Sequence, residues 1–297
     1  MKFLSELITI AKTKPIHKLV VAAADDLTVL KAVQNAVIEK IVYPILIGNE
    51  QKILDICHGI DFDVAEYEII NEPDPTKSVQ KAAELINKGK ANILMKGLVS
   101  TSTILKVVIA KDNGLRKSAV LSHFALFESK FYHKILGVTD AAMNIAPTFE
   151  EKINILNNAV EIMHKLGYSF PKVALIAPVE TINDKIESTI HAAMLTMMYK
   201  RKQLTGCIVD GPLSLDNAVS LEASKHKGIV SEVAGDADIV MVPELNSGNV
   251  LYKSLIFLGG AISAAIVTGA KVPIVLTSRA DSEHSKLMSI AFAAALE

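Results

Sequence analysis

The 297-residue chain has few cysteines, few arginines and no excess of either charge. Its two cysteines, Cys57 and Cys207, form no metal-binding or redox spacing, so we expect small buried hydrophobic residues in a reducing cytoplasm. A net charge of −1 without a basic tail argues against a nucleic-acid partner. No apolar run reaches the roughly 18 residues of a membrane span, and the N-terminus has no apolar core of signal-peptide type. We therefore expect no membrane partner.

The few arginines are informative because lysine supplies almost all of the positive charge. Only Arg116, Arg201 and Arg279 occur. Arg201 lies at the expected C-terminal end of a helix, where a cation complements the helix dipole. Arg279 instead follows an apolar segment directly, and a rigid, two-pronged donor at that point suggests a site for an anion.

The pattern of apolar residues predicts the fold class. Half of the residues are apolar and 21% are charged, which is typical of a globular chain with a sizeable core. Short apolar segments, such as 18–24, 43–47 and 93–95, alternate with segments of helical periodicity. Because these strands are apolar on both faces, we predict an α/β fold with a parallel sheet covered on both sides. The most apolar segment, 255–267, is predicted to be a buried helix.

The first candidate site lies in segment 241–253, Met-Val-Pro-Glu-Leu-Asn-Ser-Gly-Asn-Val-Leu-Tyr-Lys. Its apolar start predicts a buried strand that Pro243 ends, and the apolar periodicity from Val250 onward predicts a helix. The polar turn between them would place backbone N–H groups at a helix N-terminus, which favours an anion. The alternative is that Asn246 or Ser247 is only the N-cap of the helix.

Two other turns have a similar character. Lys96-Gly97 precedes four hydroxyl residues, 100–103, at the start of a predicted helix. This arrangement could bind an oxyanion, although ordinary helix capping explains it at least as well. Segment 277–281, Thr-Ser-Arg-Ala-Asp, is a further turn from a strand into a helix.

In chain order, these segments resemble the phosphate acetyl/butyryl transferase family. The resemblance rests on Lys96-Gly97 to Lys106, Asp140 with Asn144 and Pro147, Gly235-Asp236-Ala237-Asp238, Asn246-Ser247-Gly248-Asn249 with Tyr252-Lys253, and Ser278-Arg279. The compact length, and Ser-Arg-Ala-Asp-Ser where acetyl-type members have Ser-Arg-Gly, resemble the phosphate butyryltransferase branch.

The resemblance implies a fold like that of the isocitrate/isopropylmalate dehydrogenases, with two α/β domains and an active-site cleft between them. The first domain would comprise residues 1–126 and 268–297, and the second residues 127–267. The implied reaction converts a short-chain acyl-CoA, with butyryl-CoA expected, and inorganic phosphate into acyl phosphate and free coenzyme A. Coenzyme A would be a co-substrate, with no metal and no permanently bound cofactor. The resemblance also implies a homodimer or a larger homo-oligomer.

The resemblance also implies roles for individual residues. Ser278, Arg279 and Asp281 are expected to be catalytic, although acetyl-type members carry their aspartate at the position of Ser285. Asp281 could equally be the N-cap of the last helix. The expected substrate-binding residues are Lys96, Ser100, Thr101, Lys106, Asp140, Asn144, Asn246, Ser247, Asn249 and Lys253. Lys106 stands where acetyl-type members carry an arginine. We expect the turns at Ser247 and Arg279 to converge on one phosphoryl group.

Two other functions remain open from the residues alone. An NAD(P)-dependent, metal-assisted 2-hydroxy-acid dehydrogenase of the same fold would need an arginine cluster, which three arginines do not favour. A non-catalytic relative that binds acyl phosphate or coenzyme A is favoured only by the missing aspartate at position 285. His123 and His191 are predicted to be satisfied core or interface residues rather than ligands.

Overall fold

A computed structural model of the chain describes residues 1–112, 114–277 and 281–297. The fold is mixed α/β, and contacts between Cα atoms separate two compact units. Unit 1 comprises residues 1–3 and 122–262, and unit 2 comprises residues 4–121 and 263–297. These boundaries fall at the start of β5 (Ser122–Glu128) and within β10 (Ile262–Thr268), and the expected domain division after residues 126 and 267 stays a prediction. Strand β5 pairs with β6 (Leu136–Thr139) inside unit 1.

Unit 2 contains strands in the order β3-β2-β1-β4-β11-β10. Its strands besides β10 are β1 (His17–Ala22), β2 (Val42–Gly48), β3 (Glu68–Asn71), β4 (Ile93–Lys96) and β11 (Ile274–Val275). Pairing is parallel from β3 through β11, and β10 is antiparallel to β11. Every residue of β4 is buried, so both faces of that strand are covered, as the continuous apolar runs predict.

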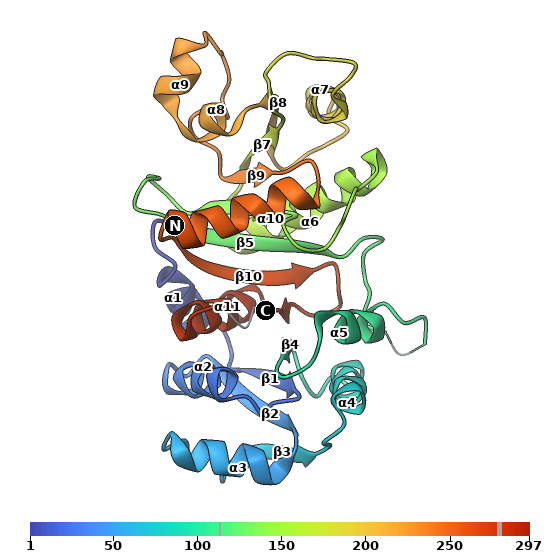
Figure 1. Ribbon diagram of the computed structural model, residues 1–297, viewed down its shortest axis with the longest axis vertical. Coiled ribbons are helices and arrows are strands. Elements are labelled where there is room, and N and C mark those ends of the chain that lie inside the picture. Colours follow the sequence, from blue (N-terminus) through green and yellow to red (C-terminus); the bar gives the residue numbers. More distant parts are fainter. Residues whose placement is uncertain (113, 278–280) are drawn as a thin grey trace. The chain divides into compact units, whose positions relative to one another are not determined.

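The helices of unit 2 follow the strands in alternation. They are α1 (Glu6–Lys12), α2 (Leu27–Ile38), α3 (Glu50–Gly59), α4 (Pro75–Asn87), α5 (Thr101–Val108) and α11 (Glu283–Leu296). Helix α11 packs against α1 and α2, and α4 packs against α5 (Figure 1). Local signals set the helix starts: the Asp26 carboxylate accepts from the Val29 amide and caps α2, and Pro75 opens α4 behind the Asp74 cap.

Unit 1 contains strands in the order β5-β6-β9-β7-β8, with β5 antiparallel to β6 and the remaining pairs parallel. Its other elements are α6 (Phe149–Lys165), β7 (Lys172–Ile176), α7 (Glu187–Lys200), β8 (Ile208–Leu213), α8 (Leu215–Val219), α9 (Leu221–His226), β9 (Ile239–Met241), α10 (Leu245–Lys253) and the π-helical turn η1 (Ser254–Leu258). A capping box of Thr148 and Glu151 is present at the start of α6.

The prediction of a buried helix over 255–267 is wrong. The helical segment ends at Leu258, Gly260 takes a positive φ of 64°, and β10 follows from Ile262. A short apolar run does not distinguish a buried strand from a buried helix by periodicity, and the β-branched residues at its end favour the strand. A second departure from a simple helix follows β8, where α8 and α9 are two short helices that meet at Ser220.

Candidate active site

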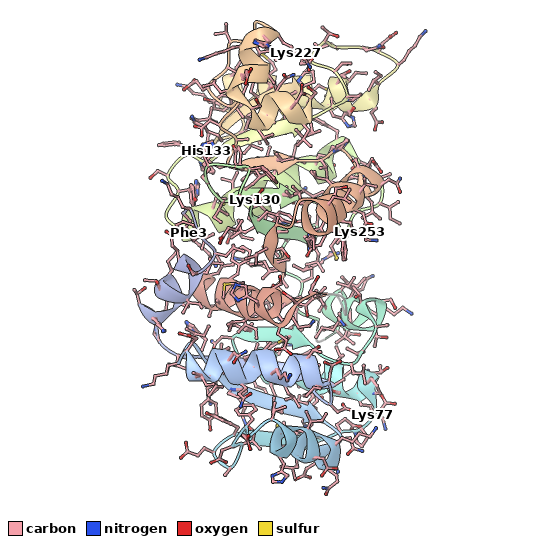
Figure 2. All side chains as sticks on the ribbon, turned by 60° about the vertical axis from the view of Figure 1, so that its left-hand side comes forward. Phe3, Lys77, Lys130, His133, Lys227 and Lys253 are labelled. Atoms are coloured by element: carbon pink, nitrogen blue, oxygen red, sulfur yellow. The ribbon has the colours of Figure 1, made fainter. Side chains whose placement is uncertain are left out.

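The N-terminus of α10 lies against the carboxyl end of β6 in unit 1. The contact depends on Gly248, because a Cβ atom there would lie 2.7 Å from the Asp140 carbonyl oxygen and 2.9 Å from the Ala141 Cα. Only a residue without a side chain lets the helix approach this closely. The structure therefore brings Asp140 together with the motif helix that carries Asn246, Ser247, Asn249 and Lys253. Lys253 is exposed at the end of that helix (Figure 2).

The cap of α10 differs from both readings of the sequence. Neither Asn246 nor Ser247 is the N-cap: Glu244 is, and its carboxylate accepts from the amides of Asn246 at 2.6 Å and Ser247 at 2.7 Å. Burial opposes ionisation of Glu244, but these hydrogen bonds outweigh it and hold its pKa below the ordinary value. The two amides that we expected to face a phosphoryl group thus bind an internal carboxylate in this conformation.

Asp140 and Asn144 form a compact loop at the end of β6. The Asp140 side chain is 4% exposed and accepts from the Ala142 and Met143 amides, both at 2.9 Å, and from Asn144 Nδ2 at 2.5 Å. Three donors on one buried carboxylate fix the loop rigidly. Asp140 therefore positions this corner.

His123 of β5 also belongs to this corner, although the sequence reading set it aside. The antiparallel register pairs Ala125 with Val138, so two residues further along His123 stands opposite Asp140. The His123 ring makes an edge-to-face contact with Tyr252 of α10, with centroids 5.7 Å apart. The prediction that His123 is buried is confirmed, but the prediction that it is satisfied is wrong for Nδ1, which is enclosed and has no hydrogen-bond partner.

The predicted residues of unit 2 lie around the start of α5. Lys96 is 9% exposed at the end of β4, and its ammonium donates to the carbonyls of Gly97 and Val99, both at 3.2 Å. Ser100 is the N-cap of α5, accepting from the Thr103 amide at 3.1 Å, as the capping interpretation predicted. Thr101 is the exposed first residue of α5, and Lys106 is exposed in its last turn.

In the C-terminal segment 277–281 the structure describes Thr277 and Asp281, and Ser278 and Arg279 lie outside the described residues. The N-cap of α11 is Ser282, which accepts from the Ser285 amide at 3.1 Å, so the interpretation of Asp281 as the N-cap is wrong. The Asp281 carbonyl accepts from the ammonium of Lys286, a residue only 2% exposed, at 2.6 Å. The sequence could have indicated this hydrogen bond, because Lys286 lies within the apolar face of the last helix.

The Gly-Asp-Ala-Asp motif has a structural role at the other end of the same strands. Asp236 accepts from Lys172 at 2.6 Å, Lys134 at 2.8 Å and His133 at 2.9 Å. Asp238 accepts from Lys134 at 2.7 Å and from the Lys172 amide at 2.8 Å. Because Asp238 directly precedes β9, this network lies at the amino end of the parallel strands, away from the Asp140 loop.

Two kinds of feature are absent from the described residues. Within 1–112, 114–277 and 281–297, no group of three or more histidine, cysteine, aspartate or glutamate residues is placed to hold a metal ion. Over the same part of the chain, no helix combines the length and the apolar character that crossing a membrane requires. Cys57 and Cys207 are buried, as predicted, and burial raises the pKa of each thiol to about 11.

Comparisons with known proteins agree with the resemblance read from the motifs. The family described as Phosphate acetyl/butaryl transferase matches residues 71–294. The chain is 46% identical to the phosphate butyryltransferase of Clostridium acetobutylicum, over 99% of this chain and 98% of that protein. It is 41% identical to the phosphate acetyltransferase of Thermotoga maritima, over 98% of this chain and 99% of the relative.

Comparison with solved structures supports the same family. A branched-chain phosphotransacylase from Enterococcus faecalis superposes with a TM-score of 0.85 at 35% identity, covering 95% of this chain and 99% of the other. A 4-hydroxythreonine-4-phosphate dehydrogenase from Burkholderia phymatum superposes with a TM-score of 0.58, covering 95% of this chain and 99% of the other, but at 12% identity this likeness concerns the fold alone. The chain therefore belongs to the phosphate acetyl/butyryl transferase family and is a phosphate acyltransferase.

Proposed function

We propose that the enzyme transfers a short-chain acyl group, with butyryl as the preferred group, between coenzyme A and inorganic phosphate. The observation that carries this proposal is the 46% identity, over nearly the whole of both chains, to a protein named phosphate butyryltransferase. A second relative, from Bacillus subtilis, is named a probable phosphate butyryltransferase and is 47% identical over 94% of this chain. The branched-chain title of the Enterococcus faecalis structure also fits an acyl group larger than acetyl.

The transfer is direct, within a complex that holds both substrates. A phosphate oxygen attacks the thioester carbonyl carbon, the C–O bond forms, and the C–S bond of the tetrahedral intermediate breaks. The proton that hydrogen phosphate loses balances the proton that the departing thiolate gains. The protein must hold two anions in line, which removes most of the entropic barrier. It must also stabilise the oxyanion, and each preformed donor contributes about 3–4 kcal/mol to that.

Ser278, Arg279 and Asp281 carry the catalytic steps in this proposal. The Arg279 guanidinium offers two parallel N–H donors to the phosphoryl group, and Ser278 donates to phosphate or to sulfur. Asp281 moves the proton, and its backbone is held by the buried Lys286. The thiol, with an ordinary pKa of about 8.5, needs such a proton-transfer group near neutral pH.

We propose that ten residues contact the substrates. Those in unit 2 are Lys96, Ser100, Thr101 and Lys106, and those in unit 1 are Asp140, Asn144, Asn246, Ser247, Asn249 and Lys253. We further infer the isocitrate/isopropylmalate dehydrogenase-like arrangement, a homodimer or larger homo-oligomer, and a cytoplasmic location. Coenzyme A acts as a co-substrate, and the reaction needs neither a metal nor a resident cofactor.

The test is a thiol-release assay with butyryl-CoA and phosphate in the presence of EDTA. We expect phosphate-dependent release of free thiol, fastest with butyryl-CoA in a series from acetyl-CoA to hexanoyl-CoA. Release that needs a divalent metal, or a maximum at acetyl-CoA, would contradict the mechanism or the acyl preference, respectively. The 2-hydroxy-acid dehydrogenase hypothesis gains no support from the dehydrogenase structures, since their likeness is limited to the fold.

A further inference from the structure

His123 occupies a position in unit 1 where a packed histidine costs free energy unless one of its nitrogens has a partner. The residue is 5% exposed, and Nδ1 is enclosed without a hydrogen-bond partner. Nε2 of the same ring is not among the enclosed atoms without a partner. The backbone is fixed as well, because the Thr139 hydroxyl donates to the His123 carbonyl at 2.9 Å. Because Nδ1 is enclosed, a ligand could complete the hydrogen bonding of this ring only at Nε2.

The burial of Nδ1 determines which tautomer is favoured. An enclosed N–H donor without an acceptor is costlier than an enclosed lone pair, since orphaned buried donors are the rarer case in proteins. The proton of the neutral ring is therefore best placed on Nε2. Burial lowers the pKa of His123, and the Asp140 carboxylate only partly opposes this, so the ring is neutral. The result is an imidazole that presents a single donor, Nε2–H.

The neighbours of His123 are the elements that carry the expected phosphoryl-binding residues. Tyr252, whose ring contacts His123, lies one turn after Gly248 on the same face of α10, and Gly248 packs on the Asp140 carbonyl. Tyr252 also contacts Phe127, four residues after His123 on the same face of β5, with centroids 5.2 Å apart. Asp140 itself has its carboxylate occupied by three donors of its own loop. His123 is thus a buried polar group of this corner with donor capacity left over.

We propose that His123 is a substrate-binding residue that donates a hydrogen bond from Nε2 to an oxygen of the phosphoryl group, in bound phosphate and in acyl phosphate alike. The proposal rests on the proposed function and adds a residue to its phosphoryl site. A neutral donor suits this task because it binds a phosphoryl oxygen without exchanging a proton with it. Asp140 acts as a positioning residue, holding the loop against which the ring lies.

Steady-state kinetics with each substrate varied in turn test this assignment. His123→Phe keeps a ring in the space but removes the donor, and losing a hydrogen bond to a charged group should raise KM for phosphate roughly tenfold to a hundredfold. KM for butyryl-CoA should stay within about twofold of wild type, because the substitution removes no hydrogen bond to that substrate. His123→Gln restores an N–H near Nε2 and should recover most of the phosphate affinity. His133→Phe is the matched control, because His133 lies exposed in the Asp236 network (Figure 2).

An unchanged KM for phosphate in His123→Phe would overturn the proposal. So would an equal rise in both KM values together with a lowered melting temperature, which would indicate packing alone. A variant that does not fold leaves a test on the intact enzyme: nitrogen-15 NMR of the imidazoles, with His123 assigned through His123→Gln. We expect a neutral Nε2–H tautomer whose Nε2 signal shifts when inorganic phosphate is added. An Nδ1–H tautomer, or no response to phosphate, would refute the assignment even if the enzyme proved inactive on every acyl-CoA.

Discussion

The contact between α10 and the end of β6 makes a sharp prediction about Gly248→Ala. The added methyl carbon would lie 2.7 Å from the Asp140 carbonyl oxygen, 2.8 Å from Val242 Cγ2 and 2.9 Å from the Ala141 Cα. Two of these three atoms belong to the backbone and cannot rotate away. The helix must therefore move away from the Asp140 loop.

Two opposing effects set the magnitude for Gly248→Ala. Alanine is the better helix former by about 1 kcal/mol, which favours the variant. Overpacking costs roughly 1–3 kcal/mol, and contacts with rigid backbone place this site near the upper end. The steric term wins, leaving a net loss of about 2 kcal/mol. With about 2–4 °C per kcal/mol for a domain of this size, the melting temperature should fall by about 4–8 °C.

The assay combines thermal unfolding with the kinetics of phosphate. Moving α10 displaces Asn249 and Lys253, so we expect KM for phosphate to rise along with the loss of stability. Gly59→Ala is the control: Gly59 is the last residue of α3, and a Cβ there meets nothing within 4 Å, so that variant should be as stable as wild type or slightly more stable. If Gly248→Ala melts no lower than Gly59→Ala, the close approach does not exist in solution.

Three further variants test the rest of the site and fold. Arg279→Lys should lower kcat severely with an unchanged melting temperature, because lysine lacks the planar fork of arginine. Arg201→Lys, at the end of α7, is the control and should behave as wild type. If Arg279→Lys has the same kinetics as Arg201→Lys, the active site lies elsewhere. Glu244→Ala removes the α10 cap and should cost about 1 kcal/mol in thermal unfolding, with Glu244→Gln in between; an unaltered melting temperature for the alanine variant contradicts the observed cap. Burial opposes ionisation of Asp236, but hydrogen bonds from Lys134, Lys172 and His133 outweigh it and hold its pKa well below 3.8. Its ionisation therefore stabilises the fold at higher pH, and this contribution is lost as the pH falls below 3.8 towards the folded-state pKa. Asp236→Asn should flatten the acid limb of a stability-versus-pH curve measured by denaturant unfolding, and an acid limb identical to that of wild type would show that the network carries no such linkage.

Local signals in the sequence were enough for much of the fold. The caps at Asp26 and Thr148, and the helix opened by Pro75, act within three or four residues, so each depends on neighbouring residues alone. Continuous apolar runs indicated strands covered on both faces for the same reason, because burial on two sides leaves no polar positions. Motif order identified the family, and the comparisons confirm that assignment.

Contacts between distant residues decided what the local patterns left open. Within segment 255–267, the strand begins only at Ile262, and it pairs with β11 through Val267 and Ile274. Periodicity within 13 apolar-rich residues could not reveal that pairing. Glu244 is the cap that the alternative interpretation assigned to Asn246 or Ser247, and its carboxylate accepts from both of their amides. The Gly-Asp-Ala-Asp motif proved to be an ion-pair network at the amino end of the strands.

The sequence by itself determined the α/β class, most element positions and the chemistry of the family, because these depend on short-range periodicity and on motif order. Only the tertiary structure placed His123 opposite Asp140, enclosed its Nδ1 and left that nitrogen unpaired. The local sequence around a histidine in an apolar strand does not indicate whether the ring nitrogens have hydrogen-bond partners. That depends on the strand register and on the packing of a helix more than 120 residues away, and neither can be inferred from neighbouring residues.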